Sequence, residues 1–292
     1  MSFKILTDTS ANIPTPYLKK NDVDVIAFSY IIGDEVLTCT DTETFDSEPY
    51  YDKIRNGLFV KTSQISPQLY ADFFRPYLER GEEFIYISMS SGISGSFNSA
   101  QIGMQMLEDE FPNAKVRLID SLGASLGQGI LVFRALECRR NGMSLDETAD
   151  WLLEHRWSIA QIATVDDIMF LKRTGRVSGA VAVVGAVLGI KPVVKGNSDG
   201  QLVMYNVVRG RKQALQFLAK KYDEFVFEPE NQTVGIAHAG CRNDANYLAE
   251  LLKRNNPPKE ILVVDYEPVT GAHIGPGTVA LFFESTKGVR ER

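Results

Sequence analysis

Strand-like and helix-like segments alternate through the first half of the chain, and this alternation most restricts its possible folds. The predicted strands are short runs rich in β-branched and aromatic residues, at Phe3–Asp8, Asp24–Ile32, Glu83–Met89 and Lys115–Asp120. Helical patterns follow at about 15–20, 67–80, 97–109 and 123–141. Thr15 and Ser66 each precede a proline, which predicts a helix N-cap at both places. Such alternation predicts an α/β fold with a parallel, Rossmann-like sheet and flanking helices.

The second half of the chain has a different pattern. Six strand-like runs lie at about 158–164, 191–195, 201–208, 232–237, 260–266 and 278–284, with helical stretches at about 210–222 and 242–254. Asp199-Gly200 predicts the turn of a hairpin. We therefore expect a second α/β domain with a mixed, mostly antiparallel six-stranded sheet. A chain of 292 residues suits two domains, which we predict at residues 1–157 and 158–292.

Composition and charge argue against several classes of protein. The net charge is -6 and the charges are scattered, so neither a nucleic-acid-binding stripe nor a polybasic membrane tail is expected. The longest uncharged apolar stretch, Val177–Ile190, is too short to span a bilayer, so no stable membrane insertion is expected. The three cysteines form no C-x-x-C pair, and no signal peptide is visible. These features predict a cytoplasmic protein without a metal site.

Four loops rich in small hydroxyl side chains are predicted to meet at one edge of the first sheet. They contain TDTSANIP, KTSQISP, SSGISGS and DSLGAS. Because the carboxyl ends of parallel strands share one edge, ligands of such sheets bind there. Hydroxyls and free backbone N–H groups at a helix start favour an anion. Helix capping alone would explain any one of these loops, but four together favour an anionic ligand.

The same serine-rich loop also raises a catalytic alternative. GISGS resembles the G-x-S-x-G nucleophile elbow, and His238 or His273 would be candidate bases. Ser96 stands where the elbow needs its second glycine, and no acid is placed for a triad. A stand-alone serine-dependent acyl-ester hydrolase therefore remains the alternative function.

An apolar stretch of small residues, Gly179–Gly189, is predicted to be a buried helix. Core packing explains such a helix, and so does the lining of a tunnel for a long apolar ligand. In the second case we expect Ala182, Gly185 and Ile93 to line the tunnel. An anion site joined to an apolar tunnel is what a fatty acid requires, because each buried methylene contributes about 0.8 kcal/mol.

Six spaced motifs together resemble the DegV family of bacterial fatty-acid-binding proteins, nearly from end to end. They are TDTSANIP, TSQISP, SSGISGSFNSA, DS, DDIMFLKRTGRVSGA and HIGPGT. Two departures from the family pattern are mild: Ile65 replaces a frequent proline, and Ser96-Phe97 replaces a frequent Thr-Tyr. The resemblance implies a two-domain α/β fold that holds a long-chain fatty acid, such as palmitate, stearate or oleate, between the domains.

The resemblance also implies roles for particular residues. Thr62, Ser94, the backbone of Gly95 and His273 would hold the carboxylate. Arg176 would lie near the pocket mouth, and Arg209 would face the phosphate or a partner.

The resemblance further implies a non-enzymatic carrier with no catalytic residues and no cofactor beyond its bound acid. It would be the acyl-binding subunit of a fatty acid kinase that serves bacterial phospholipid metabolism, and a separate ATP-binding subunit would make acyl phosphate. A third possibility is a lipid-responsive regulator, which would bind the acid without kinase coupling.

Overall fold

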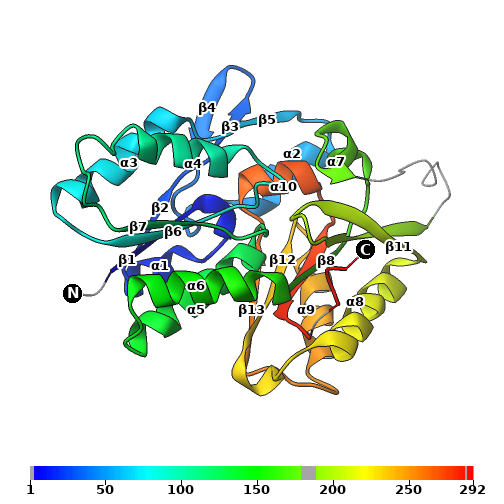
Figure 1. The fold of residues 1–292 in the computed structure, drawn as a ribbon. Helices are drawn as coiled ribbons and strands as arrows, with labels where there is room; N and C mark the ends of the chain where they lie inside the picture. Colours follow the sequence, from blue (N-terminus) through cyan, green and yellow to red (C-terminus); the bar gives the residue numbers. More distant parts are fainter. Residues whose placement is uncertain (1–2, 179–188, 287, 292) are drawn as a thin grey trace. The chain divides into compact units, whose positions relative to one another are not determined.

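The computed structural model describes residues 3–178, 189–286 and 288–291. Its contacts group the chain into two compact units (Figure 1). Unit 1 contains Met1–Phe45 and Lys61–Arg156, and unit 2 contains Asp46–Val60 and Trp157–Arg292. The predicted domains, 1–157 and 158–292, differ from these units in the placement of residues 46–60 and of Trp157.

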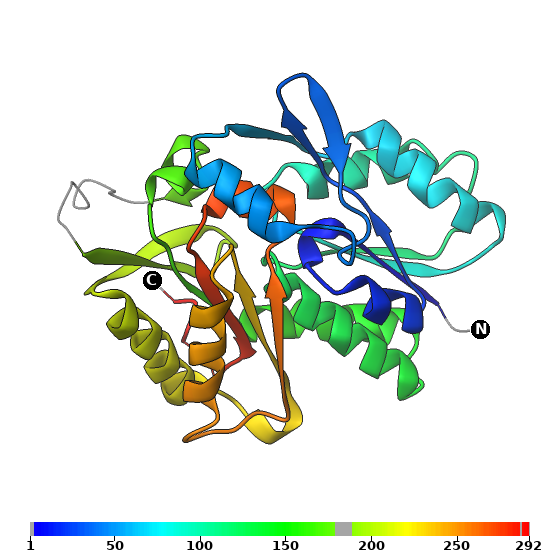
Figure 2. The same ribbon diagram turned by 180° about the vertical axis from the view of Figure 1, so that it is seen from behind.

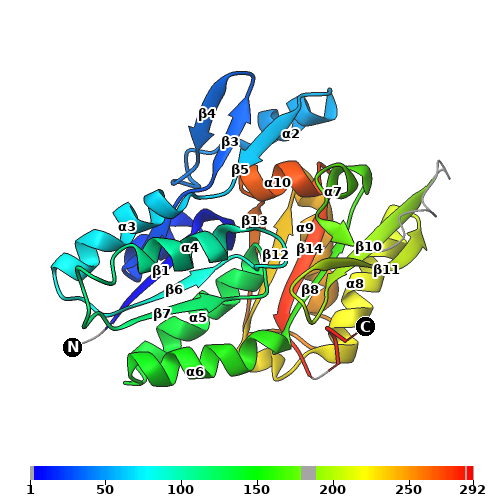
Figure 3. The ribbon, with the colours of Figure 1, turned by 45° about the horizontal axis from the view of Figure 1, so that its top comes forward.

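Unit 1 contains the predicted parallel sheet. Its strand order is β2-β1-β6-β7, formed by β1 (Lys4–Asp8), β2 (Val23–Ile26), β6 (Phe84–Ser88) and β7 (Val116–Asp120). β1 and β6 are almost entirely buried, since helices cover both faces of the sheet. Figure 3 shows α3 (Pro67–Glu79) and α4 (Ser96–Gln105) on one face, with α5 (Leu126–Arg140) and α6 (Leu145–His155) on the other. The Rossmann-like prediction for this half of the chain is confirmed.

The predicted strand Asp24–Ile32 is wrong as a single element. β2 ends at Ile26, and β3 (Ser29–Ile32) joins a separate three-stranded sheet of order β4-β3-β5, with β4 (Glu35–Thr38) and β5 (Val60–Ser63). Between the two strands, the Phe28 backbone N–H donates to Thr9 Oγ1 at 3.1 Å. This bond lies at the break between β2 and β3.

Only one of the two predicted N-caps is confirmed. The Ser66 hydroxyl accepts a 3.3 Å hydrogen bond from the Leu69 N–H at the start of α3. Thr15 is instead the first residue of α1 (Thr15–Lys20), whose N-cap is Pro14. The hydroxyl of Thr15 accepts a 2.8 Å bond from the Thr42 backbone N–H. A long-range contact therefore replaces the local cap that the Thr-Pro pair predicted.

Unit 2 contains a seven-stranded mixed sheet of order β13-β12-β14-β8-β10-β11-β9. The six predicted strands are present as β8 (Ile159–Thr164), β10 (Ile190–Gly196), β11 (Leu202–Arg209), β12 (Thr233–His238), β13 (Glu260–Asp265) and β14 (Val279–Glu284). The two-residue β9 (Val177–Ser178) adds a short parallel partner for β11. Pairing is parallel for β12–β13 and β9–β11 and antiparallel for the other neighbours. The β10–β11 hairpin is confirmed, with Gly200 at φ +71° in its loop.

The core of unit 2 lies between this sheet and two helices, α8 (Arg211–Phe225) and α9 (Arg242–Leu252). It contains Ile162, Leu218, Ile236, Leu248 and Phe283, all nearly inaccessible to solvent. These residues come from three central strands and both helices. The alternation of apolar residues on the strands and the apolar stripes on α8 and α9 therefore account for this layer.

Helix α2 (Ser47–Arg55), which the sequence patterns did not predict, belongs to unit 2 because it packs against α10 (Pro268–Ile274) (Figure 2). The Tyr51 hydroxyl donates a 2.6 Å bond to the Tyr266 carbonyl, and Tyr50 donates to the Pro268 carbonyl at 2.7 Å. A Cβ on Gly271 would collide with the Tyr51 ring, so glycine is what allows the two helices to approach this closely.

Candidate functional site

The hydroxyl-rich loops that follow β1, β6 and β7 meet at the carboxyl edge of the unit 1 sheet, as predicted. Met89 N–H, at the end of β6, donates to Asp8 Oδ2 at 3.1 Å, and the Ser90 N–H donates to the Gly123 carbonyl at 2.7 Å. Ser91 donates to Asp120 from its backbone at 3.1 Å and from its hydroxyl at 2.5 Å. Some of the serines in these loops therefore form hydrogen bonds that join one loop to another.

Ser94 is placed differently from these joining serines. The Ile93 and Ser94 N–H groups both donate to the Ser90 carbonyl, which closes a tight turn directly before α4. The half-buried Ser94 hydroxyl lies 3.1 Å from Ser96 Oγ and accepts a 3.3 Å bond from the Ser96 N–H. Gly95 is exposed at the N-cap position of α4. Ser94 and Gly95 therefore stand at the positive end of a helix dipole, where an anion is favoured.

The TSQIS segment at the end of β5 is brought against this turn. Ile65 N–H donates to Ser96 Oγ at 3.3 Å, and a Cβ on Gly95 would collide with the side chain of Gln64. Thr62 is half-buried and two positions before Gln64, so in this extended segment both side chains emerge on the same side. The structure thus brings together the segments that carry Thr62, Ser94 and Gly95. Sequence reasoning did not single out Gln64, although it lies within the TSQ motif.

Unit 2 provides a second group of polar residues, His273 on α10 and Arg176 after α7 (Met169–Arg173). Burial, together with the smaller effect of the nearby positive charge of Arg176, lowers the pKa of His273 to about 4. A neutral imidazole beside a guanidinium suits an anionic ligand, because the ring can donate a hydrogen bond while the arginine supplies the charge. Within this unit, Arg176, predicted at the pocket mouth, therefore lies near His273, which was predicted to hold the carboxylate.

The glycines of GAHIGPGT have structural causes. Gly275, at φ +86°, ends α10, and a Cβ there would collide with the Phe170 ring. Gly277, at φ +81°, lies against the Asp166 carboxylate. Both backbone conformations are strained for residues other than glycine. These close approaches hold the loop that follows His273 against α7 and its N-terminal neighbours.

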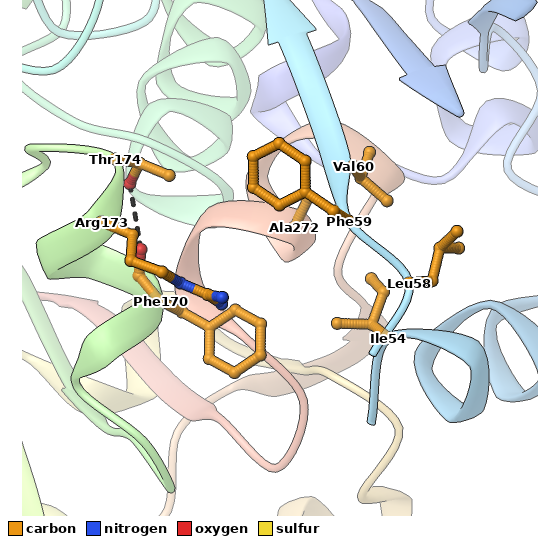
Figure 4. A pocket seen from close by; sticks show the side chains of 8 residues that line it. All are labelled: Ile54, Leu58, Phe59, Val60, Phe170, Arg173, Thr174 and Ala272. Atoms are coloured by element: carbon orange, nitrogen blue, oxygen red, sulfur yellow. Dashed lines mark hydrogen bonds between the residues drawn. The ribbon is translucent and has the colours of Figure 1, made fainter. Parts of the chain in front are cut away.

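A small pocket of mixed polar and apolar lining lies next to α10 in unit 2 (Figure 4). It is lined by Ile54, Leu58, Phe59, Val60, Phe170, Arg173, Thr174 and Ala272. Its volume is about 20 Å³, and one water molecule needs about 10–15 Å³ of such space. In this form the pocket therefore has no room for an acyl chain. Of the predicted tunnel residues, Ala182 and Gly185 lie outside the described residues, and Ile93 is half-buried in the turn before Ser94.

The remaining candidates of the sequence analysis lie elsewhere in unit 2. Arg209 is exposed at the end of β11. His238 is buried with its Nδ1 3.2 Å from Asp265 Oδ1, and burial is the main cause that lowers its pKa. The nearby Ser47 hydroxyl donates to Asp265 at 2.7 Å rather than to the histidine. This arrangement gives His238 a structural partner and provides no nucleophile–base pair.

The described ranges, 3–178, 189–286 and 288–291, contain neither a candidate metal site nor a candidate membrane span. No group of three or more histidine, cysteine or carboxylate side chains there could hold a metal ion. No helix in those ranges is long and apolar enough to cross a membrane.

The amino-acid sequence matches a known family over almost its whole length. A family model described as "Uncharacterised protein, DegV family" matches residues 2–286. A DegV domain-containing protein of Clostridium perfringens is 34% identical over 282 residues, which cover 96% of this chain and 97% of the relative. The chain belongs to the DegV family.

Solved structures extend the comparison to the whole fold. A DegV family protein from Thermus thermophilus, described in terms of fatty acid binding, matches with a TM-score of 0.86 at 28% identity, over 98% of this chain and 100% of that one. A fatty acid binding DegV family protein from Streptococcus agalactiae matches with a TM-score of 0.82 at 29% identity, over 99% of this chain and 100% of that one. This class of two-unit α/β proteins therefore includes relatives described as binding fatty acids.

The lowered pKa of His273 predicts a pH dependence of stability. An unfolded histidine titrates near pH 6.5, whereas folded His273 titrates at about 4. Between these pH values the unfolded chain binds a proton that the folded protein does not bind. The contribution of His273 to the free energy of unfolding is therefore fully present above about pH 6.5 and falls as the pH drops toward 4.

The ring resonances of the three histidines can be followed by NMR, with His273→Gln as the assignment control. Arg176→Gln should raise the His273 midpoint only in part, because burial is the larger cause. A wild-type midpoint at or above 6.5 would contradict the proposed environment.

Proposed function

We propose that this protein binds a long-chain fatty acid, such as palmitate, stearate or oleate, and that Thr62, Ser94, Gly95 and His273 hold its carboxylate. The observation that carries the proposal is the turn before α4. There, Ser94 and Gly95 stand at a helix N-terminus and the TSQ segment lies against them. The descriptions of the Thermus thermophilus and Streptococcus agalactiae relatives as fatty acid binding support the same ligand.

The proposed site requires both units to contribute to one ligand. Thr62, Ser94 and Gly95 belong to unit 1, whereas His273 and Arg176 belong to unit 2. The family resemblance supports a shared carboxylate, and the chemistry of each group fits it. Unit 1 offers neutral donors at a helix dipole, and unit 2 offers a neutral imidazole beside a guanidinium.

The two ends of the ligand would contribute differently to binding. Hydrogen bonds to a charged group contribute about 1.5–3 kcal/mol each, which selects a carboxylate and sets its orientation. Each buried methylene adds about 0.8 kcal/mol, so most of the affinity would come from the acyl chain. The shape of the tunnel would then select among fatty acids with different acyl chains. We still predict that Ala182, Gly185 and Ile93 line this tunnel.

We further propose that the protein is a carrier without catalytic residues that presents its bound acid to a separate kinase subunit. A carboxylate oxygen would attack the terminal phosphorus of ATP held by that subunit, forming acyl phosphate as ADP leaves. Arg209 is exposed, so its charge is available to the partner or to the transferred phosphate, while Arg176 would lie near the pocket mouth. The proposed setting is the cytoplasm, with acyl phosphate entering phospholipid synthesis.

Mass spectrometry of lipid extracted from the purified protein tests the ligand class. We expect near-stoichiometric fatty acid after expression in a bacterial host, because the carboxylate and the chain are both recognised. A protein that is empty and takes up neither added oleate nor palmitate would overturn the proposal. Turnover of p-nitrophenyl esters with labelling by a fluorophosphonate would instead support the hydrolase.

Replacing Ser94 tests the carboxylate site. Ser94→Ala should weaken fatty-acid binding by about 1–3 kcal/mol, because a charged group loses one donor. The change can be measured by displacement of a fluorescent fatty acid. Asn98→Ala, at an exposed position on the same helix, is the matched control and should bind like the wild type. Unchanged affinity in Ser94→Ala would remove this residue from the site.

Replacing Arg209 tests presentation to the partner. Arg209→Ala should leave fatty-acid affinity unchanged and lower the rate of acyl phosphate formation when ATP and a bacterial fatty acid kinase subunit are added. Lys220→Ala, a surface cation on α8, is the control for a general charge effect. Equal rates for Arg209→Ala and the wild type would exclude Arg209 from the partner surface.

A further inference from the structure

The pattern G-x-S-x-G, which the serine-rich loop after β6 only approaches, occurs intact after β7. It is GASLG, Gly123–Gly127, with Ser125 at its centre. Ser125 lies between a strand and a helix, because β7 ends at Asp120 and α5 begins at Leu126. Its backbone has φ +52° and ψ −141°, a conformation that is strained for a residue with a side chain. A nucleophile elbow has the same features, since its serine stands on a strained strand-to-helix turn.

The hydroxyl of Ser125 is buried without a partner. Only 1% of the residue is exposed, and its Oγ has no hydrogen-bond partner among residues 3–178, 189–286 and 288–291. Although Ser125 is the N-cap residue of α5, its side chain does not cap the helix. No base is bonded to this serine to activate it as a nucleophile. A buried hydroxyl left unsatisfied in this way is instead suited to donate to a ligand.

The N-terminus of α5 provides a second donor beside this hydroxyl. The helix has 15 residues, and the N–H of its first residue, Leu126, has no acceptor within the helix. Its first turn, LGQG, contains no acidic side chain to occupy the positive end of the helix dipole. The hydroxyl, the N–H group and the dipole therefore all favour an oxygen atom with negative charge.

These donors lie next to the proposed carboxylate site along the edge of the unit 1 sheet. β6 and β7 are paired, and paired strands lie about 4.8 Å apart. The Ser90 N–H donates to the Gly123 carbonyl at 2.7 Å, and the Ser90 carbonyl accepts bonds from the Ile93 and Ser94 N–H groups. Ser90 therefore joins the turn that carries Ser94 to the loop that carries Ser125.

We propose that Ser125 and the N-terminus of α5 form a phosphate subsite, which takes the phosphoryl group of the acyl phosphate made from the bound acid. This inference rests on the proposed function, because it assumes that Ser94 holds the carboxylate that is phosphorylated. A phosphoryl group on that carboxylate extends the head group beyond the Ser94 turn. The neighbouring loop on this edge is the one that carries Ser125. There the Ser125 hydroxyl and the Leu126 N–H donate to phosphoryl oxygens, and no covalent bond to the protein forms.

A stable analogue of the acyl phosphate tests this subsite. In the β-ketophosphonate that corresponds to palmitoyl phosphate, a methylene replaces the bridging oxygen, so the carbonyl and a phosphate-like group are both kept. Affinities for this analogue and for palmitate can be measured by displacement of a fluorescent fatty acid. Ser125→Ala should lower the affinity for the analogue relative to that for palmitate by about ten- to hundredfold, because a charged group loses one donor.

Thr148→Val is the matched control for Ser125→Ala. The Thr148 hydroxyl is also buried and without a partner among the described residues. Thr148 lies on α6 between Asp146 and Asp150, which pair with Arg117 near the amino end of β7, at the opposite edge of the sheet. Thr148→Val should therefore keep the wild-type ratio of the two affinities. An equal fall of this ratio in Thr148→Val and Ser125→Ala would overturn the subsite.

Ser125→Gly separates ligand binding from backbone strain. Glycine adopts φ +52° readily, so this variant should be at least as stable as the wild type in thermal unfolding, yet lose the analogue as Ser125→Ala does. Wild-type ratios in both Ser125 variants, with weakened palmitate binding in Ser94→Ala, would overturn the phosphate subsite and leave the proposed function standing. A wild-type protein that binds neither palmitate nor the analogue would overturn the proposed function and the subsite with it.

Discussion

The buried carboxylate of Asp8 is the interaction on which the candidate site of unit 1 depends. Its two oxygens accept hydrogen bonds from the segments that follow β1 and β6 and from α5. A carboxylate without these partners would be costly to bury, so the three segments are held in one arrangement. The turn that carries Ser94 begins directly after Met89, whose N–H is one of these donors. The geometry of an exposed turn therefore rests on a group with no access to solvent.

The serine-rich loops combine two roles that look alike in sequence. Ser10 and Ser91 are committed to carboxylates of the protein itself, Asp8 and Asp120. The Ser94 hydroxyl is hydrogen-bonded to the neighbouring Ser96, and it stands before α4, where the helix dipole favours an anion. The same residue type therefore joins loops within the protein at two positions and stands at a helix N-terminus at a third.

Unit 2 uses a different means to suit an anion. Burial keeps His273 neutral at ordinary pH, and Arg176 beside it reinforces the effect. The imidazole of His273 then stays uncharged and can donate a hydrogen bond. Of these two side chains, Arg176 carries the positive charge. The glycines at 275 and 277 hold this region because Phe170 and Asp166 occupy the space that side chains there would need.

Local patterns in the sequence determined the fold class and the motifs of the candidate site. They also determined the ten longer strands of the two larger sheets, although they missed the break after Ile26. Strand and helix periodicity and the turn residues report the conformation of their own neighbourhoods, which explains this success. Ser144 and Glu147 even form a capping box at the start of α6, a signal that would have revealed that helix. Only the tertiary structure decided that residues 46–60 pack with unit 2 and that Thr15 bonds to Thr42 instead of capping its helix. It also decided that the buried Asp8 accepts a hydrogen bond from Tyr86, which is bonded in turn to Tyr70. These contacts join residues far apart in the chain, and no local propensity records which distant partner satisfies a buried polar group.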